Sequence, residues 1–460
     1  MPAKGRINRF FLRNALFPLA GLVLAVPTGP EPRADDGRTT PLKERTVLVQ
    51  KRIAAEFDDL LTLYKHLHSH PELSLHEVQS AARMAKELKD LGFTVTEKVG
   101  GTGVVGVLKN GDGPTVLVRT DLDALPVTEA TDLPYASKVR VRDANDNEVG
   151  VMHACGHDMH MTCFVGTARV LTALKNQWHG TLVFIAQPAE EVGMGAKAML
   201  KDGLFTRFPR PDYALALHCD ATRPYSTLGY TDGLALANVD SVDILVRGKG
   251  GHGAAPHTTI DPIVISARIV LDLQTLVSRE TNPTDPAVVT VGSIHGGAKH
   301  NVIPSEVKMQ LTVRSTKDAV RKHLLEGIQR IAKAAAEGAG APEPVVTIDT
   351  EGFTPALLND SKLAQKTASL FKEVIGEDKV QERPAVMGGE DFARYGKEGV
   401  PIFLFWLGTV APDRVAEAAR DEAKALPSLH SDQYHPIPGP SIKTGVLAMS
   451  MAVMNLMAKK

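Results

Sequence analysis

A short segment in the first half of the chain, HACGHDMHMT (His153–Thr162), combines three histidines, a cysteine and an aspartate. Cys155 and His157 are two residues apart, a spacing that puts both side chains on one side of an extended or turning segment. Thiolate and imidazole are preferred ligands of borderline-soft metals such as Zn²⁺. His153, His157 and His160 also fit the i, i+4, i+7 stripe of a helix. The segment alone therefore fits a metal site and a helix face with incidental histidines equally well.

A pair of adjacent carboxylates is the second candidate. In AQPAEEVGMGAK, Glu190 and Glu191 follow the apolar run Leu182–Ile185. A strand that ends in two such residues would point them in opposite directions, so that one binds a metal while the other moves protons. Adjacent glutamates are also common on solvated surfaces. This pair, however, follows an apolar run at the expected sheet edge, where sites in α/β proteins form.

Two histidine-containing segments complete the set. His218 ends the apolar run of YALALHCD, and His430 and His435 belong to the loop segment LPSLHSDQYHP. Taken singly, a histidine at a strand end is more often structural, and loop histidines are usually just exposed. Together the four segments supply five candidate ligands and one further base: Cys155, His157, Glu191, His218 and His430, with Glu190. That is too many ligands for one tetrahedral zinc ion and suits two metals that share a bridging group.

Alternating helical and extended patterns must position these groups. Helical periodicity over Ile53–Ser69 and Leu75–Leu91 precedes a series of short apolar runs that predict strands. The strands predicted in this half are Phe93–Lys98, Val104–Leu108, Thr115–Thr120, Thr181–Gln187 and Tyr213–His218, with a helix over Asp158–Lys175. Strands that alternate with helices of this length indicate an α/β domain with a central mixed sheet flanked by helices.

The pattern changes near residue 237. Alternation around Val242, Ile244 and Val246 predicts a half-buried strand, and a helix, two strands and another helix follow it at Pro262–Leu276, Ala287–Ile294, Glu306–Val313 and Lys317–Ala336. We interpret this block as an inserted α+β domain with a four-stranded sheet and two helices. One face and edge of its sheet would stay open, which favours pairing with a second copy. The first pattern then resumes, with elements near Ser361–Ile375, Pro401–Leu407 and Pro440–Met457.

Length and charge set further limits. A chain of 460 residues is long enough for two or three domains. We expect a signal peptide and linker at 1–40, a catalytic domain in two parts at 48–236 and 349–460, and the inserted domain at 237–348. The formal net charge of -1 gives no electrostatic reason to expect nucleic acid or an acidic membrane surface as a partner. The presence of only three cysteines argues against a disulfide framework as the basis of the fold.

The N-terminal segment has the pattern of a secretory signal. MPAKGRINRFFLRN contains basic residues and no acid, and the apolar run Ala15–Val26 follows it. That run is short for a transmembrane helix, which needs about 20 residues, so we expect no stable membrane insertion. The prediction is an exported protein, periplasmic or secreted, whose mature fold begins near Leu48. If the segment is instead a mobile arm, the protein would be cytoplasmic.

The motifs taken together resemble the M20 metallopeptidase superfamily. The similarity is to its amidohydrolase branch, which includes hippurate hydrolases, N-acyl-amino-acid amidohydrolases and auxin-conjugate hydrolases. It runs from about Leu60 to the C-terminus. The motifs that carry it are HSHPELSLHE, RTDLDALPVTE, HACGHDMH, QPAEEVGMGA, GKGGHGAAPH, HNVIP, GGEDFA and LHSDQYH.

The resemblance implies a dinuclear site and assigns its ligands. It implies zinc or manganese, with nickel or cobalt tolerated. Glu190 would be the general base that activates the attacking water and then protonates the leaving amine. Cys155 would be the bridging group of the ligand set, which is Cys155, His157, Glu191, His218 and His430.

The resemblance also implies roles around that site. The wider superfamily has an H-x-D motif where this chain reads Arg119-Thr120-Asp121. This is the pattern of the amidohydrolase branch, in which His157 is the replacement ligand. Asp121 would orient a ligand by a hydrogen bond, or would simply cap the strand end.

The inserted domain would be a lid and dimerisation domain. His252 would stabilise the oxyanion, reaching across from the second subunit of a homodimer. Asn301 and Arg314 would hold the substrate carboxylate, which a guanidinium can bind in a bidentate manner. An alternative interpretation is that Arg314 is simply an exposed arginine at the end of a strand. Glu390 and Asp391 are expected to cap the helix that follows them.

The implied reaction is hydrolysis of the amide bond of an N-acyl-L-amino acid, hippurate-like or N-acetyl. Its products would be a carboxylic acid and a free amino acid. One alternative is a dipeptidase or aminopeptidase-like member of the same superfamily, whose free-amine substrate would need a carboxylate near its N-terminus. The other is a catalytically silent metal- or peptide-binding protein. The presence of Glu190 argues against that alternative, because a site that only binds a metal needs the ligand residues and no general base.

Overall fold

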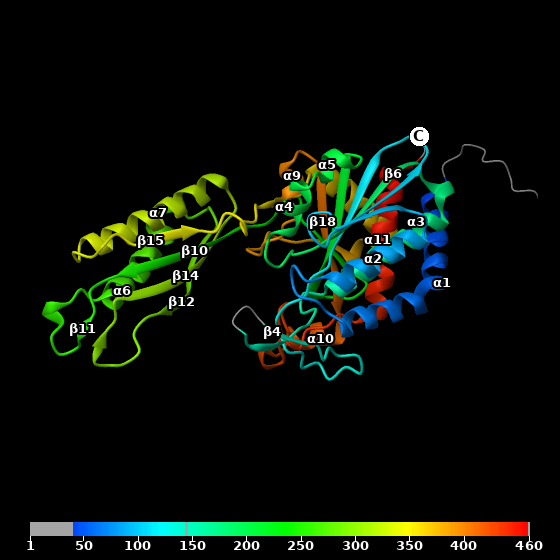
Figure 1. Cartoon of the computed structure of the whole chain (residues 1–460). Coiled ribbons are helices and arrows are strands. Elements are labelled where there is room, and N and C mark those ends of the chain that lie inside the picture. The colour runs from blue at the N-terminus through cyan, green and yellow to red at the C-terminus, as the bar shows by residue number, and fades with distance from the viewer. Residues whose placement is uncertain (1–39, 143–145, 459–460) are drawn as a thin grey trace, which may run out of the picture. The chain divides into compact units, whose positions relative to one another are not determined.

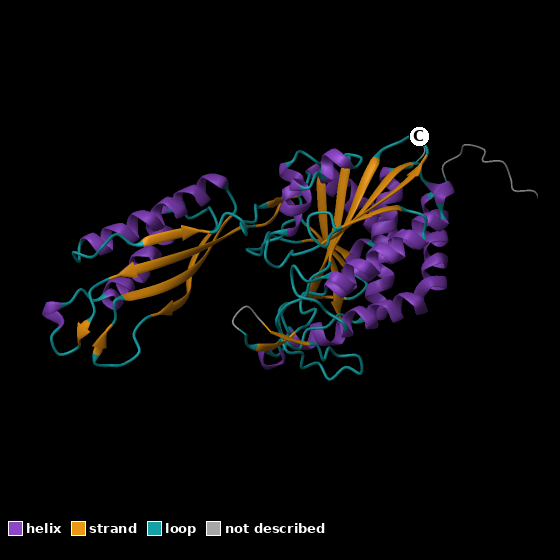
Figure 2. Ribbon diagram, in the orientation of Figure 1, coloured by secondary structure: helices purple, strands orange, loops and turns teal. Residues whose placement is uncertain are grey.

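The structure is a computed structural model that describes residues 40–142 and 146–458. The expected signal segment lies outside the described residues. Two main sheets organise the chain: an eight-stranded sheet and a four-stranded sheet, each with its own helices (Figures 1 and 2). This confirms the predicted combination of an α/β sheet and a separate α+β block. No helix among the described residues is long and apolar enough to cross a membrane.

The eight-stranded sheet is mixed, with four parallel strands at its centre. These are β6 (Gly180–Gln187), β3 (Thr115–Asp121), β7 (Tyr213–Pro224) and β18 (Ile402–Val410). Their apolar runs are buried on both faces, as expected for parallel strands covered by helices on both sides. Antiparallel β1 (Thr94–Glu97) and β2 (Val104–Asn110) extend one edge, and β8 (Leu228–Tyr230) and β17 (Val380–Glu382) extend the other.

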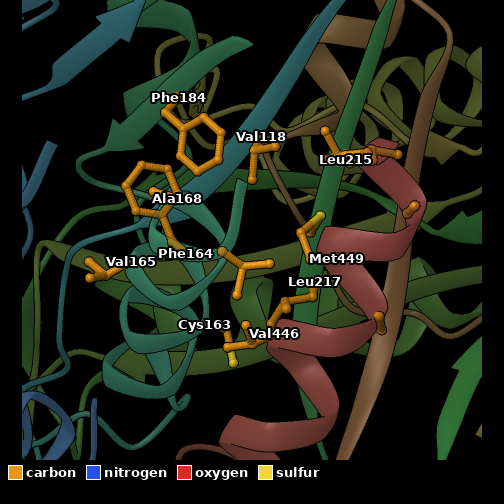
Figure 3. Packing of buried hydrophobic residues seen from close by; sticks show 14 of the residues in the cluster. Val118, Cys163, Phe164, Val165, Ala168, Phe184, Leu215, Leu217, Val446 and Met449 are labelled. Atoms are coloured by element: carbon orange, nitrogen blue, oxygen red, sulfur yellow. The ribbon is translucent and has the colours of Figure 1, made fainter. Parts of the chain in front are cut away.

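Long helices cover one face of this sheet. They are α1 (Leu42–Ser69), α2 (Val78–Asp90), α3 (His157–Ala173), α8 (Ser361–Ile375) and α11 (Pro438–Leu456). Figure 3 shows how Phe164 of α3 and Met449 of α11 pack against Phe184 and Leu215 of the sheet. The crossing of α3 and α11 is close, because a Cβ added at Gly445 would meet Cys163 Sγ at 2.5 Å. Cys163 thus has a packing role.

The other face of the sheet carries shorter helices, α4 (Gly195–Lys201), α5 (Leu204–Arg207) and α9 (Ala393–Lys397). The predicted helix bounds hold closely for α3 and α8. The first helix begins at Leu42, before the expected start of the fold at Leu48. Strand β7 also continues beyond His218, where the prediction ended it.

The four-stranded sheet is antiparallel, with the order β12 (Ala287–His295), β14 (Glu306–Ser315), β10 (Asn238–Arg247) and β15 (Val345–Ile348). Side chains alternate between buried and exposed along β10, as its sequence predicts. Helices α6 (Pro262–Thr275) and α7 (Asp318–Glu337) pack with it in one apolar cluster. A π-helical turn, Leu276–Glu280, continues α6.

The remaining elements are short. Three two-stranded ladders are formed by β11 (Gly251–His252) with β13 (Val302–Ile303), β9 (Leu234–Leu236) with β16 (Leu357–Leu358), and β4 (Arg140–Arg142) with β5 (Glu148–Gly150). Helix α10 (Pro412–Ala418) and four 3₁₀ turns complete the described chain, the turns being Lys175–Gln177, Pro256–Thr258, Glu377–Lys379 and Glu422–Lys424.

Candidate active site

The candidate groups meet at one edge of the eight-stranded sheet. Strand β3 ends at Asp121, β6 ends at Gln187, and β7 contains His218. Because parallel strands deliver their carboxyl ends to the same edge, the segments that follow them converge there. The loop before α3 adds Cys155, and the C-terminal loop adds His430.

All five predicted ligands and the predicted base lie in one cluster. Ligand atoms lie within 4.8 Å of one another in each of three overlapping groups. These groups are Cys155 with His157 and His218, Cys155 with Glu191 and His430, and His157 with Glu190 and Glu191. Segments separated by more than 200 residues of sequence are thereby brought together. The ligand assignments themselves stay predictions.

The donor set fits divalent cations. The Nδ1 of His157 donates to the main-chain oxygen of Asp123 at 2.8 Å, so its Nε2 is left as the basic nitrogen. That Nε2 and Glu191 Oε1 are buried without hydrogen-bond partners and are 3.7 Å apart. His218 is held in the same way by the oxygen of Cys219 at 2.8 Å, and its Nε2 lies 3.5 Å from Cys155 Sγ. Sulfur, nitrogen and oxygen donors gathered in this way suit zinc and its neighbours.

The two glutamates are not presented in the way that the sequence suggested. The prediction of a strand end with carboxylates in opposite directions is wrong. Strand β6 ends at Gln187, and the chain turns at Ala189, which has a φ of +51°. The turn brings both carboxylates towards His157, with Glu190 Oε2 at 4.0 Å and Glu191 Oε1 at 3.7 Å from Nε2.

The electrostatics of the cluster favour protonated acids. Burial raises the pKa of Glu190 well above its usual range, and the nearby carboxylates of Glu390, Glu191 and Asp391 add to this effect. Burial also raises the pKa of Glu191 to about 7, although His157 opposes the rise. The pKa of the Cys155 thiol is raised for the same reasons, burial and neighbouring carboxylates. Bound cations would offset this accumulation of negative charge.

Asp121 is buried beside the cluster, and its hydrogen bonds differ from the expected one. Its Oδ1 accepts from His160 Nδ1 at 2.8 Å, whereas its Oδ2 lies 3.7 Å from His157 Nε2. His160 in turn accepts a hydrogen bond from the Cys219 N–H at 2.8 Å. His160 therefore supports the site. His153 makes no such contact, since neither of its ring nitrogens has a hydrogen-bond partner within residues 40–142 and 146–458. Burial lowers the pKa of His153 to about 4.

A buried arginine that sequence reasoning missed links the strands behind the cluster. Arg119 is inaccessible to solvent and donates to Asp121 at 2.7 Å, Glu390 at 2.8 Å and Asp391 at 3.2 Å. The expected capping is found in part. Glu390 accepts from the Phe392 N–H, next to α9, but Asp391 accepts from the Ala196 N–H at the start of α4. An arginine within an otherwise apolar strand was the signal for this network.

A cavity of about 750 Å³ opens onto the cluster. Cys155, Glu190, Glu191, His218 and His430 all contribute to its lining, and so does Arg314. His252 and Asn301 are not among the lining residues. His252 is exposed on β11, and the Asn301 main-chain oxygen accepts from the Gly253 N–H. Of the three residues predicted to contact substrate from the inserted block, the structure thus brings only Arg314 to the cavity.

Comparisons with known proteins agree with this arrangement. The sequence profile described as Peptidase family M20/M25/M40 matches residues 117–429. The N-acetylcysteine deacetylase of Bacillus subtilis (strain 168) is 35% identical over 76% of this chain and 88% of its own length. The hippurate hydrolase of Campylobacter jejuni is 36% identical over 71% of this chain and 82% of its own length. The solved structure of YXEP from Bacillus subtilis, described as a dinuclear metal-binding peptidase of the M20 family, has a TM-score of 0.69 at 29% identity. It covers 88% of this chain and 100% of its own.

Proposed function

Because the chain belongs to peptidase family M20/M25/M40, we propose that it is a metal-dependent amidohydrolase that cleaves N-acyl-L-amino acids. The products would be a carboxylic acid, acetate or benzoate in the simplest cases, and a free amino acid. One observation carries this proposal: the candidate base Glu190 lines a cavity together with four of the five candidate ligands and with Arg314, a cation that can bind a carboxylate. The named relatives support it, since two of them act on N-acyl amino acids.

The residues that would hold two divalent cations are Cys155, His157, Glu191, His218 and His430. Zinc or manganese fits this set, and nickel or cobalt would be tolerated. When bound, such cations supply a Lewis acid for the scissile carbonyl and lower the pKa of a nearby water towards about 7.

Glu190 would move the proton. It takes a proton from the attacking water and returns it to the leaving nitrogen as the amide bond breaks. Burial and the neighbouring carboxylates raise the pKa of Glu190, and a higher pKa favours the return of the proton to the leaving nitrogen. The neighbouring carboxylate of Glu191 would remain a metal ligand throughout the reaction.

Arg314 would bind the α-carboxylate of the amino-acid part. Its Nη1 donates to the Met387 oxygen at 2.8 Å, and its Nε contacts Thr312 Oγ1 at 3.3 Å. These bonds fix the plane of the guanidinium, and within the described part of the chain Nη2 keeps its donors free for a ligand. A planar guanidinium in a fixed orientation suits a carboxylate.

Two further parts of the proposal concern assembly and location. We propose a homodimer formed through the four-stranded block, in which His252 of one subunit stabilises the oxyanion in the other, with Asn301 nearby as a substrate contact. The exposed position of His252 and the free edges of β12 and β15 support this. Export of the protein is proposed from its N-terminal basic and apolar pattern alone.

The test is amine release by the purified protein, loaded in turn with zinc and with manganese. The substrates are hippurate, a set of N-acetyl amino acids and a few free dipeptides. Release from the acylated compounds alone is the expected result. Release from dipeptides alone would make the protein a peptidase, and no release from any of them with metal bound would contradict an enzymatic function.

A further inference from the structure

A second arginine, Arg383, lines the same cavity as Arg314. It directly follows the edge strand β17, and its backbone is tied to the sheet. The Arg383 N–H donates to the Tyr230 oxygen at 2.8 Å, and its carbonyl accepts from Thr231 Oγ1 at 3.0 Å. The position of this side chain is therefore set by the sheet, which is how precise binding groups are held.

The Arg383 guanidinium lies over an aromatic ring next to the cluster of candidate metal ligands. It lies over Trp406, 4.2 Å from the ring centroid, and its Nη1 donates to Asp220 Oδ2 at 2.9 Å. Trp406 is the register partner of His218 in the parallel pair β18 and β7. Side chains of register partners leave the sheet on the same face. The guanidinium thus lies beside the neighbour of a predicted metal ligand.

The charges around Arg383 do not cancel. Asp220, 5% exposed, also has Arg223 Nε at 3.5 Å, while its Oδ1 accepts from the Thr222 N–H and hydroxyl at 2.9 and 2.6 Å. One carboxylate therefore faces two guanidiniums. Within residues 40–142 and 146–458, Asp220 is the only acid that pairs with Arg383, whose Nε and Nη2 keep free donors. A surplus positive charge with free donors is left at the cavity wall.

Apolar surface adjoins this charge. Leu236 and Val386 line the cavity together with Trp406, and a backbone bridge holds the first two side by side. Apolar walls with one fixed polar group at the end are the usual build of a small-molecule subsite. A short hydrocarbon chain that ends in an anion matches this combination.

We propose that Arg383 is the anion-binding residue of the acyl subsite, and that the substrates are amino acids acylated by short dicarboxylic acids. N-malonyl, N-succinyl and N-glutaryl amino acids form this class. This inference rests on the proposed function and narrows its substrate. The substrate then carries a carboxylate at each end, with Arg314 taking the amino-acid end and Arg383 the acyl end. Arg383 offers its carboxylate the neighbouring donors Nε and Nη2, whereas Arg314, whose Nε and Nη1 are engaged, offers Nη2.

A purely structural role for Arg383 would be to neutralise Asp220 and to cover Trp406. Arg223 provides the matched control, because it contacts the same carboxylate but does not line the cavity. Replacing either arginine leaves Asp220 paired with the other arginine. Both variants are therefore expected to fold, and a difference between them reports on the cavity.

The experiment measures kcat/KM of the metal-loaded protein for N-malonyl-, N-succinyl- and N-glutaryl-L-alanine. Each is compared with the neutral N-acyl-L-alanine of the same carbon number: propanoyl, butanoyl and pentanoyl. For at least one chain length we expect the charged acyl group to be preferred roughly 10- to 100-fold, the range of a hydrogen bond to a charged group. Arg383→Gln should bring this ratio close to one, and Arg223→Gln should preserve it.

Each other outcome has a clear meaning. Preference for the neutral acyl group at every length, or an unchanged ratio in Arg383→Gln, overturns the inference and leaves the proposed function standing. Absence of turnover with all six compounds, with metal bound, overturns the proposed function itself. If Arg383→Gln does not fold, the same comparison is made with Arg383→Lys. Lysine keeps the positive charge but lacks the planar pair of donors, so this variant should retain only part of the preference for the charged acyl group.

Discussion

The Nε2 of His157 faces the Oε1 of Glu191 across 3.7 Å in the interior of the protein, and neither atom has a hydrogen-bond partner among the described residues. A buried polar atom without a partner costs about 1–3 kcal/mol, so two such atoms side by side indicate a missing third group. Both atoms are metal-ligand types, and Cys155 and His218 are close by. This pair is the strongest structural argument for a cation at the centre of the cluster.

The first prediction concerns metal stoichiometry. Protein stripped with a chelator and then loaded with zinc or manganese should bind two ions per chain. His157→Ala should bind about one or fewer, because this histidine belongs to two of the ligand groups. Elemental analysis after dialysis measures the content.

The matched control for metal binding is His435→Ala. His435 lies in the same C-terminal loop as His430 but is in none of the ligand groups. It should bind two ions, as the wild type does. Equal metal loss in both variants, or no loss in either, would contradict the ligand assignment.

The second prediction is a pH dependence of stability caused by His68. Burial alone would lower its pKa, but hydrogen bonds to Asp158 at 2.7 Å and Glu129 at 3.0 Å, with the charges of both, raise it to about 9. A raised folded-state pKa stabilises the fold fully below the unfolded value of about 6.5 and ceases to do so as the pH rises through 9. The contribution lost is about 3 kcal/mol.

Denaturant unfolding of the wild type and of His68→Gln tests this. The difference in unfolding free energy between them should be larger at pH 6 than at pH 9.5. His70→Gln, an exposed neighbour, should differ little from the wild type at either pH. A difference for His68→Gln that does not change with pH would show that this histidine is neutral in the fold.

The third prediction concerns the Arg119 network. Arg119→Met should destabilise the fold by about 3–5 kcal/mol, because it leaves the carboxylates of Asp121, Glu390 and Asp391 buried without their cation. Arg414→Gln breaks an exposed pair with Glu417 and should leave stability close to that of the wild type, because water screens such a pair. Unfolding of both variants at neutral pH measures the contrast. Equal, small losses would mean that the network has no structural role.

Much of the fold could be predicted from the sequence, because long periodic segments determine their own secondary structure. The periodicity of Ser361–Ile375 gives the observed bounds of α8, and the alternation along β10 gives its buried face. Short strands without such a pattern, among them β8, β15 and β17, were missed. Their pairing depends on neighbours that are distant in the sequence.

The site could be predicted less fully. Two of the candidate ligands could be recognised from their position, since Glu191 follows an apolar run and His218 ends one. The left-handed turn at Ala189, which aims both glutamates inward, has no sequence signal because alanine rarely adopts it. Two partners of Arg119, Glu390 and Asp391, come from a loop 271 and 272 residues further along the chain, so that only the folded structure reveals them.

The most direct test of the account is Glu190→Gln, with turnover and metal content measured on the same preparation. Glutamine keeps the shape of the side chain and removes its ability to take a proton. We predict that turnover of an N-acyl amino acid falls by about 10²–10⁴-fold, the usual contribution of a general base, while two metal ions per chain are retained. Undiminished turnover with both ions bound would contradict the role of Glu190 and, with it, the proposed mechanism.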